Sequence, residues 1–129
     1  MQRKLMVLAA LLGAAVPTHA AMAATPDLVG SWVGKAERID AKGKYSEADI
    51  VVTIVDQKDR RFHGTITHEG TTDKIVGMIR SDIKTFYWVN VDNQGLVQGS
   101  MLGADVFEAC RLESGENAQV SCAKMTRKQ

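Results

Sequence analysis

The chain has 129 residues, with 16 Lys and Arg against 15 Asp and Glu and a formal net charge of +1 at pH 7. This length supports one domain with a modest hydrophobic core. Charges of both signs are interspersed, without a basic stripe or block, which argues against nucleic acid or a membrane as a partner. Composition leaves the oligomeric state open.

Residues 1–23 have the layout of a secretory signal peptide. Arg3 and Lys4 precede an apolar run over residues 5–16, and small residues follow around Ala20 and Ala23. The run is much shorter than the roughly 20 residues that a membrane helix needs. We expect cleavage after Ala23, with Ala20 as the alternative. A single mature domain, residues 24–129, would then reside in the periplasm or outside the cell, with 14 basic against 15 acidic residues.

The two cysteines, Cys110 and Cys122, are both in the predicted mature domain. An even number of cysteines in an oxidising compartment indicates a disulfide. In an antiparallel hairpin centred on Glu116, these two residues would face each other, and Glu108 would face Lys124. The turn residues around position 116 agree with that centre. A short helix over residues 106–114, capped by Asp105, is the alternative to a strand here.

Eight short segments rich in Val, Ile, Thr and aromatic residues follow one another, separated by Gly, Asp, Asn and Lys. They cover residues 28–39, 48–55, 62–68, 74–80, 85–91, 96–102, 106–112 and 119–125. Such segments, several with a period of two, are typical of strands. We therefore predict an all-β fold, an antiparallel up-and-down meander of about eight strands closed into a small barrel. Closure would hide both edge strands, and glycines at 64, 77 and 99 would permit the required coiling.

A Gly-x-Trp motif opens the first predicted strand as Gly30-Ser31-Trp32, and Arg127 follows the last one. This pair resembles the lipocalin and avidin superfamily, the calycins, in which the Trp closes one end of the barrel beneath a basic residue. The resemblance implies that Trp32 and Arg127 form such a plug. The polar set with which avidins bind biotin is not recognisable, so biotin binding is not implied.

The predicted lumen is almost wholly apolar. Its residues are Trp32, Ile50, Val52, Ile54, Phe62, Ile66, Ile75, Ile79, Val89, Val91, Met101, Phe107 and Met125. Consecutive strand residues point to opposite faces, so residues 86–88 (Phe-Tyr-Trp) cannot all face inward. The longer apolar row places Tyr87, Val89 and Val91 inside. Phe86 and Trp88 would then form an exposed pair that marks an interaction surface, unless a loop or the N-terminal segment covers them.

No constellation of catalytic residues is recognisable. His63 and His68 are five apart on one predicted strand and point to opposite faces, so they do not form a metal site. The acidic residues Asp56, Asp59, Glu69, Asp73, Asp82, Asp92 and Asp105 fall in predicted turns, not in a buried pair. We therefore expect neither an enzyme nor a bound metal or cofactor.

Two functions remain. An eight-stranded barrel has an interior wide enough for packed side chains or for one small molecule. The sequence therefore predicts an exported binding protein for a small hydrophobic ligand. The alternative is a protein-interaction module, such as a periplasmic enzyme inhibitor or accessory subunit that binds an envelope protein through Phe86 and Trp88.

Overall fold

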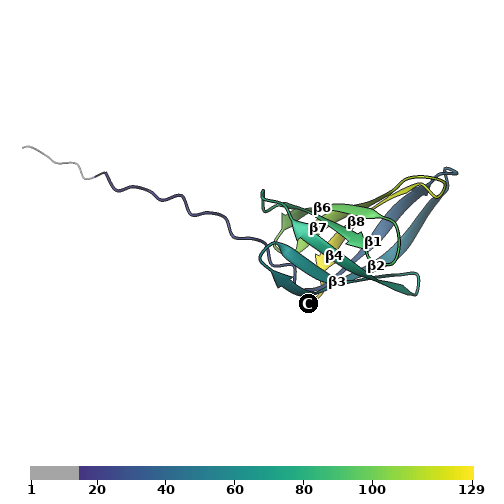
Figure 1. The fold of residues 1–129 in the computed structure, drawn as a ribbon, viewed down its shortest axis with the longest axis horizontal. Coiled ribbons are helices and arrows are strands. Elements are labelled where there is room, and N and C mark those ends of the chain that lie inside the picture. Colours follow the sequence, from purple (N-terminus) through teal and green to yellow (C-terminus); the bar gives the residue numbers. More distant parts are fainter. Residues whose placement is uncertain (1–14) are drawn as a thin grey trace, which may run out of the picture.

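Eight antiparallel strands pair in chain order to form a closed barrel (Figure 1). This is a computed structural model, and it describes residues 15–129. The strands are β1 (Gly30–Asp40), β2 (Tyr45–Lys58), β3 (Arg61–His68), β4 (Thr71–Ile79), β5 (Thr85–Asn90), β6 (Leu96–Gly103), β7 (Val106–Glu113) and β8 (Gln119–Arg127). The predicted all-β meander and its closure are confirmed.

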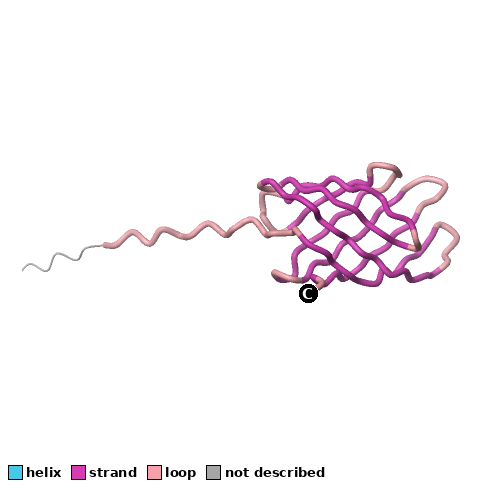
Figure 2. Tube along the Cα trace, turned by 90° about the horizontal axis from the view of Figure 1, so that it is seen from below, coloured by secondary structure: helices cyan, strands magenta, loops and turns pink. Residues whose placement is uncertain are grey.

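The barrel closes because β1 pairs with β8 as well as with β2, so every strand has two neighbours (Figure 2). Closure leaves no strand edge available for pairing with another chain. Within residues 15–129 the structure contains no helix long and apolar enough to cross a membrane.

The last hairpin has the predicted register. Residues 106–113 form strand β7 and not a helix, and Cys110 pairs with Cys122 while Glu108 pairs with Lys124. The two cysteines form a disulfide. Such bonds persist in oxidising compartments, so the disulfide indicates a location outside the reducing cytosol.

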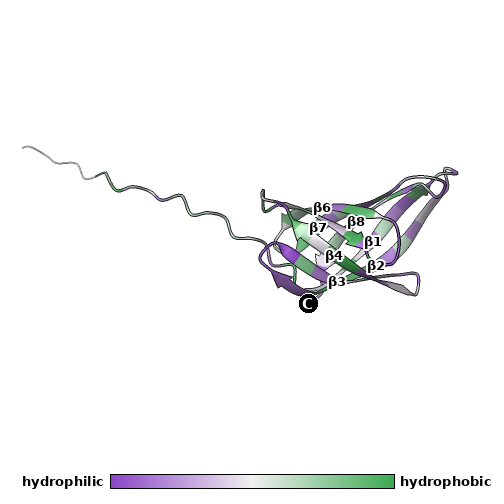
Figure 3. Ribbon diagram, in the orientation of Figure 1, coloured by the Kyte–Doolittle hydropathy of each residue, from purple (hydrophilic) through white to green (hydrophobic). Residues whose placement is uncertain are grey.

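Buried and exposed residues alternate along much of β1 and β2, as expected when successive side chains point to the lumen and to solvent. The hydropathy colouring shows hydrophobic and hydrophilic residues interspersed along the strands (Figure 3). One half of the lumen is filled by a cluster of aromatic rings. The centroid of Phe107 lies 4.7 Å from that of Trp32 and 5.3 Å from that of Phe86, and Phe62 lies 6.2 Å from Phe86. These rings make that half of the barrel a packed core.

The orientation predicted for β5 is wrong. Phe86 and Trp88 are buried in the lumen at 1% and 4% exposure, whereas Val89 and Val91 point outward at 44% and 56%. Tyr87 is half-buried. Aromatic rings fill the lumen better than valines do, and inward glycines make room for them. A Cβ on Gly99 would lie 2.2 Å from the Phe86 ring, and one on Gly77 would lie 2.2 Å from the Phe62 ring.

The chain before β1 folds across one end of the barrel, which we call the closed end. Leu28 is 2% exposed there, and the Trp32 Nε1–H donates to its carbonyl at 2.9 Å. The Leu28 N–H in turn donates to the Gln57 side chain at 2.9 Å. The apolar floor of the lumen is therefore covered at this end.

Arg127 completes the closed end. Its guanidinium carbon lies 4.2 Å from the centre of the Trp32 ring. It donates to the carboxylate of Asp105 at 2.8 Å and to the backbone carbonyls of Asp27 and Val29 at 2.7 and 2.6 Å. The structure thus brings together the two residues that the calycin resemblance paired.

The predicted signal peptide lies partly outside the described residues, since the description begins at residue 15. Residues 15–25, which include both predicted cleavage sites, are exposed and lead away from the closed end (Figure 1). They contribute nothing to the barrel core.

Candidate functional site

The half of the lumen opposite the closed end contains a cavity that opens between the strand ends. Its volume is about 50 Å³, and it continues into an open mouth. The cavity is therefore small. Its lining comprises Ala36, Arg38, Ile50, Val52, Ile66, His68, Trp88, Asn90, Val97, Ala109, Arg111, Ser121, Ala123 and Met125.

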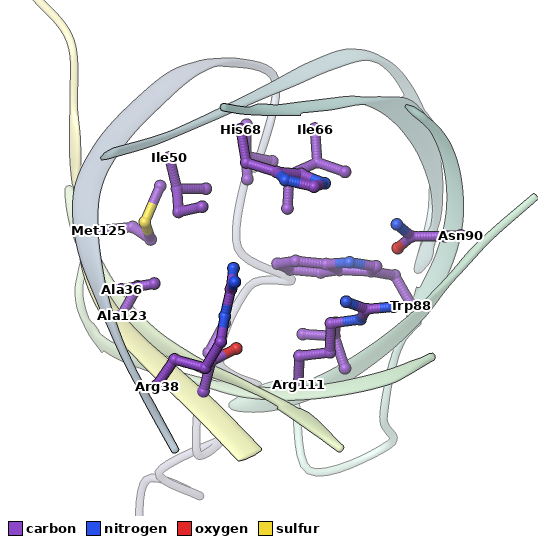
Figure 4. Close-up of a pocket in the computed structure, with 14 residues that line it drawn as sticks. Ala36, Arg38, Ile50, Ile66, His68, Trp88, Asn90, Arg111, Ala123 and Met125 are labelled. Atoms are coloured by element: carbon purple, nitrogen blue, oxygen red, sulfur yellow. The ribbon is translucent and has the colours of Figure 1, made fainter. Parts of the chain in front are cut away.

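A row of small residues creates this space. Ala36 on β1 pairs with Ala123 on β8, and Ala123 pairs with Ala109 on β7. All three alanines line the cavity. Because none of these side chains extends beyond Cβ, the wall formed by β1, β7 and β8 leaves space beside the large Trp88 ring (Figure 4).

Two arginines face the lumen next to this row. Arg38 on β1 and Arg111 on β7 both pair with Ser121 on the intervening strand β8. Their side chains extend into the lumen, and so does the ring of Trp88 (Figure 4). Both are only partly accessible, at 24% and 21% of their side-chain surface.

Arg111 has several partners. Its Nη2 lies 3.1 Å from the carboxylate of Glu113 and donates to the side-chain oxygen of Asn93 at 3.1 Å and to the carbonyl of Gln94 at 2.7 Å. These contacts hold the outer edge of the guanidinium against the loop between β5 and β6. Its Nε packs against Gly95, where an added Cβ would lie 2.5 Å from it, and has no hydrogen-bond partner among residues 15–129.

Arg38 is held more weakly. Its single ion pair joins Nη1 to Glu69 at 3.9 Å, and the Glu69 side chain is 60% exposed. Exposed ion pairs at this distance contribute little. Arg38 is therefore the less neutralised of the two cations.

A buried carboxylate lies on the opposite wall. Asp73 was predicted in a turn, but it belongs to β4 and its residue is only 7% exposed. Its Oδ2 accepts from Asn90 at 3.2 Å and from Asn93 at 2.7 Å, and lies 3.5 Å from His68 Nε2. His68 is the last residue of β3 and lies two residues after Ile66, so its side chain faces the lumen as that of Ile66 does.

Five buried side-chain polar atoms have no hydrogen-bond partner among residues 15–129, and all five belong to residues that line this one cavity. They are Arg38 Nε, His68 Nδ1, Trp88 Nε1, Asn90 Oδ1 and Arg111 Nε. Buried polar groups in native proteins are almost always paired, because an unpaired one costs about 1–3 kcal/mol. Their location around one largely apolar cavity makes this cavity the candidate functional site.

The polar residues of the cavity include a histidine beside a carboxylate. His68 and Asp73 form a pair of the kind that can orient a general base. However, no hydroxyl or thiol within the described chain hydrogen-bonds to His68 Nδ1. No cluster of three or more potential metal ligands occurs among residues 15–129.

Apart from Val89 and Val91, which face outward, the predicted lumen residues divide into two groups. Val52 and Ile66 line the cavity, together with Ile50 and Met125. The others are buried in the packed half and do not line the cavity: Trp32, Ile54, Phe62, Ile75, Ile79, Met101 and Phe107. The barrel is thus solid at one end and hollow at the other.

The sequence analysis did not identify the polar residues of the site, although the alternation of side chains along a strand places them in the lumen. Arg38 is six residues from Trp32 on one strand, so the two must share a face. Arg111 likewise shares the face of Phe107, opposite to that of Cys110. The apolar lumen that the sequence predicted did not include these two arginines.

Comparison with known proteins supports the fold alone. No protein-family model and no curated protein matches the chain. Solved structures with a similar fold include a DUF3598-family protein of unknown function from Nostoc punctiforme PCC 73102, at 13% identity and a TM-score of 0.60. That match covers 78% of this chain and 48% of the Nostoc protein, so this chain spans about half of its length.

Two further structures have a similar barrel. The S-type phycobiliprotein lyase CpeS of Guillardia theta has 10% identity and a TM-score of 0.54, with 79% of this chain and 89% of the lyase covered. A designed fluorescence-activating β-barrel has 14% identity and a TM-score of 0.51, with 78% and 94% covered. Identities this low indicate a shared small β-barrel architecture.

Proposed function

We propose that this protein is an exported, non-catalytic barrel that binds one small, mainly apolar molecule in the open half of its lumen. The observation that carries the proposal is the convergence of five unpaired buried polar atoms on a single cavity with an otherwise apolar lining. Ligand sites have this character, with hydrophobic walls and a few polar groups that fix orientation.

The dimensions of the cavity limit the ligand. The cavity volume of about 50 Å³ is well below the range of about 300–1,000 Å³ typical of small-molecule sites. The cavity therefore admits only a small or slender part of a ligand, and the rest of a larger molecule would lie in the open mouth.

The proposal also includes a calycin-like barrel and export of the protein. The Trp32–Arg127 arrangement at the closed end supports a calycin-like barrel, and the disulfide supports export. If the full chain is produced in bacteria, intact mass spectrometry of the periplasmic fraction should show cleavage after Ala23 or Ala20. The mass should also be lower by two hydrogens than that of the reduced chain. An uncleaved chain retained in the cytosol would contradict export.

The alternative of a protein-interaction module loses the aromatic pair on which it was based. Phe86 and Trp88 are buried in the lumen and offer no exposed aromatic pair. The ligand-binding proposal does not depend on them being exposed.

Binding can be tested with N-phenyl-1-naphthylamine, a neutral flat probe that fluoresces in apolar sites. We expect saturable binding at one site per barrel. Ala123→Leu should abolish it, because the larger side chain enters the cavity from the alanine row. Lys124→Leu is the matched control, since the neighbouring position on β8 is exposed and should leave binding unchanged. Absence of saturable binding to the wild-type protein would refute the proposal.

A further inference from the structure

We infer that the ligand carries an anionic oxygen head group, such as a carboxylate or sulfonate, which Arg38 and Arg111 hold at the mouth of the cavity. This inference rests on the proposed function and names the chemical class of its ligand. The apolar part of the molecule would lie deeper, against Trp88 and the alanine row.

The unpaired atoms are mostly donors. Arg38 Nε, Arg111 Nε and Trp88 Nε1 each carry a hydrogen that no group in residues 15–129 accepts. His68 Nδ1 is a fourth donor whenever that nitrogen is protonated, and only Asn90 Oδ1 is an acceptor. A group that supplies several acceptor oxygens and no donors matches this set. Carboxylates and sulfonates have that composition.

The charges around the mouth also favour an anion next to Arg38. Arg111 is neutralised by Glu113 at 3.1 Å, and Asp73 is satisfied by His68 and two asparagines. Glu69 is the remaining acidic group in contact, and it reaches Arg38 only at 3.9 Å from an exposed position. The Arg38 guanidinium therefore keeps a charge that no close carboxylate balances.

The register provides space for the head group. Arg38 and Arg111 flank Ser121, so their Cα atoms are two strand spacings apart, roughly 10 Å. The intervening serine is too small to fill the gap between the two guanidinium groups. An oxyanion placed there would receive charge-assisted hydrogen bonds, which are about twice as strong as neutral ones.

A matched pair of probes tests this inference separately from the proposed function. 8-Anilino-1-naphthalenesulfonate has the ring system of N-phenyl-1-naphthylamine with one sulfonate added. We expect the sulfonate probe to bind at least about tenfold more tightly than the neutral one, the effect of one good hydrogen bond to a charged group. In Arg38→Met the ratio of the two affinities should fall to about one, whatever the change in the affinity for the neutral probe.

The control variant is Lys35→Met, which removes a cation from the outer face of the same strand. It should leave both affinities unchanged. Arg38→Lys, which keeps the charge but loses the Nε–H, should retain part of the preference and guards against a folding defect in Arg38→Met. If neither probe binds, the proposed function fails. If the neutral probe binds but the wild-type protein shows no preference for the sulfonate, or Arg38→Met keeps it, only the anionic head group is refuted.

Discussion

The two ends of the barrel use the same residue types for different purposes. At the closed end, Arg127 lies over Trp32 and satisfies its donors with Asp105 and backbone carbonyls. At the open end, arginines and a tryptophan surround a cavity with unpaired donors. A paired polar cluster stabilises the fold, whereas an unpaired one costs stability that binding can recover. The two ends therefore differ in how their polar groups are hydrogen-bonded, more than in which residue types they contain.

The largest expected effect comes from truncating the tryptophan at each end. Trp32→Ala should cost about 3–5 kcal/mol of unfolding free energy, because the ring is fully buried among packed side chains. Trp88→Ala should cost less, about 2–3 kcal/mol, because its ring already borders a cavity. Urea unfolding followed by far-ultraviolet circular dichroism measures both. Equal losses would mean that the open half is as tightly packed as the closed half.

Removing the disulfide should affect the open end. Replacing Cys110 and Cys122 together by Ser is expected to cost about 3 kcal/mol on the chain-entropy model. Their neighbours Arg111 and Ser121 face the cavity from the same paired strands. Binding of the neutral naphthylamine probe should therefore weaken as well. Wild-type protein treated with a reductant is the control, and an unchanged urea midpoint in both would contradict the expectation.

The two arginine environments can be compared directly. Arg127→Met should lower the unfolding free energy by about 2 kcal/mol, since it removes the cation above Trp32 and several hydrogen bonds. Arg38→Met should change it by less than about 1 kcal/mol in either direction, because it also removes an unpaired buried N–H. Thermal unfolding of both variants checks this. A larger loss for Arg38→Met would show that Arg38 is structural.

The features that the sequence predicted correctly follow from the spacing and pairing of residues and strands. The cysteine spacing fixed the register of the last hairpin, and the turn residues around it agreed, so β7 and β8 were assigned correctly. The closure of the barrel followed from the number of strands and the need to hide two edges. Each of these inferences rests on local spacing, which the sequence displays directly.

The features that the sequence analysis missed depend on which side chains fit together inside the lumen. The alternating pattern in β5 is compatible with either face inward, and it is Gly99 on the neighbouring strand β6 that makes room for the inward Phe86 ring. The cavity depends on three alanines that the register brings together from three strands. Parity could have placed Arg38 and Arg111 inside, but no local signal shows that their Nε atoms lack partners.

The smallest expected effect concerns acid sensitivity at the two ends. At the closed end, hydrogen bonds from the Thr85 hydroxyl and from the backbone of Thr85 and Lys84 lower the pKa of Asp82 from 3.8 to about 2. At the open end, a backbone hydrogen bond from Lys44 lowers the pKa of Asp40. In both cases the folded-state pKa is below the unfolded value. Each carboxylate therefore stabilises the fold at neutral pH, and that contribution is lost as the pH falls from about 4 through the folded-state pKa.

Asp82→Asn should therefore unfold at a slightly lower temperature than the wild-type protein at pH 7, and the difference should close as the pH approaches 2. Asp40→Asn is the matched variant at the other end, and its difference should close over the acidic range below the unfolded value of 3.8. Thermal unfolding at several pH values between 7 and 2 measures both curves. Both carboxylates are fully exposed, so salt should reduce each effect without changing its sign. A difference for Asp82→Asn that stays constant down to pH 2 would mean that the side chain acts by shape and not by charge.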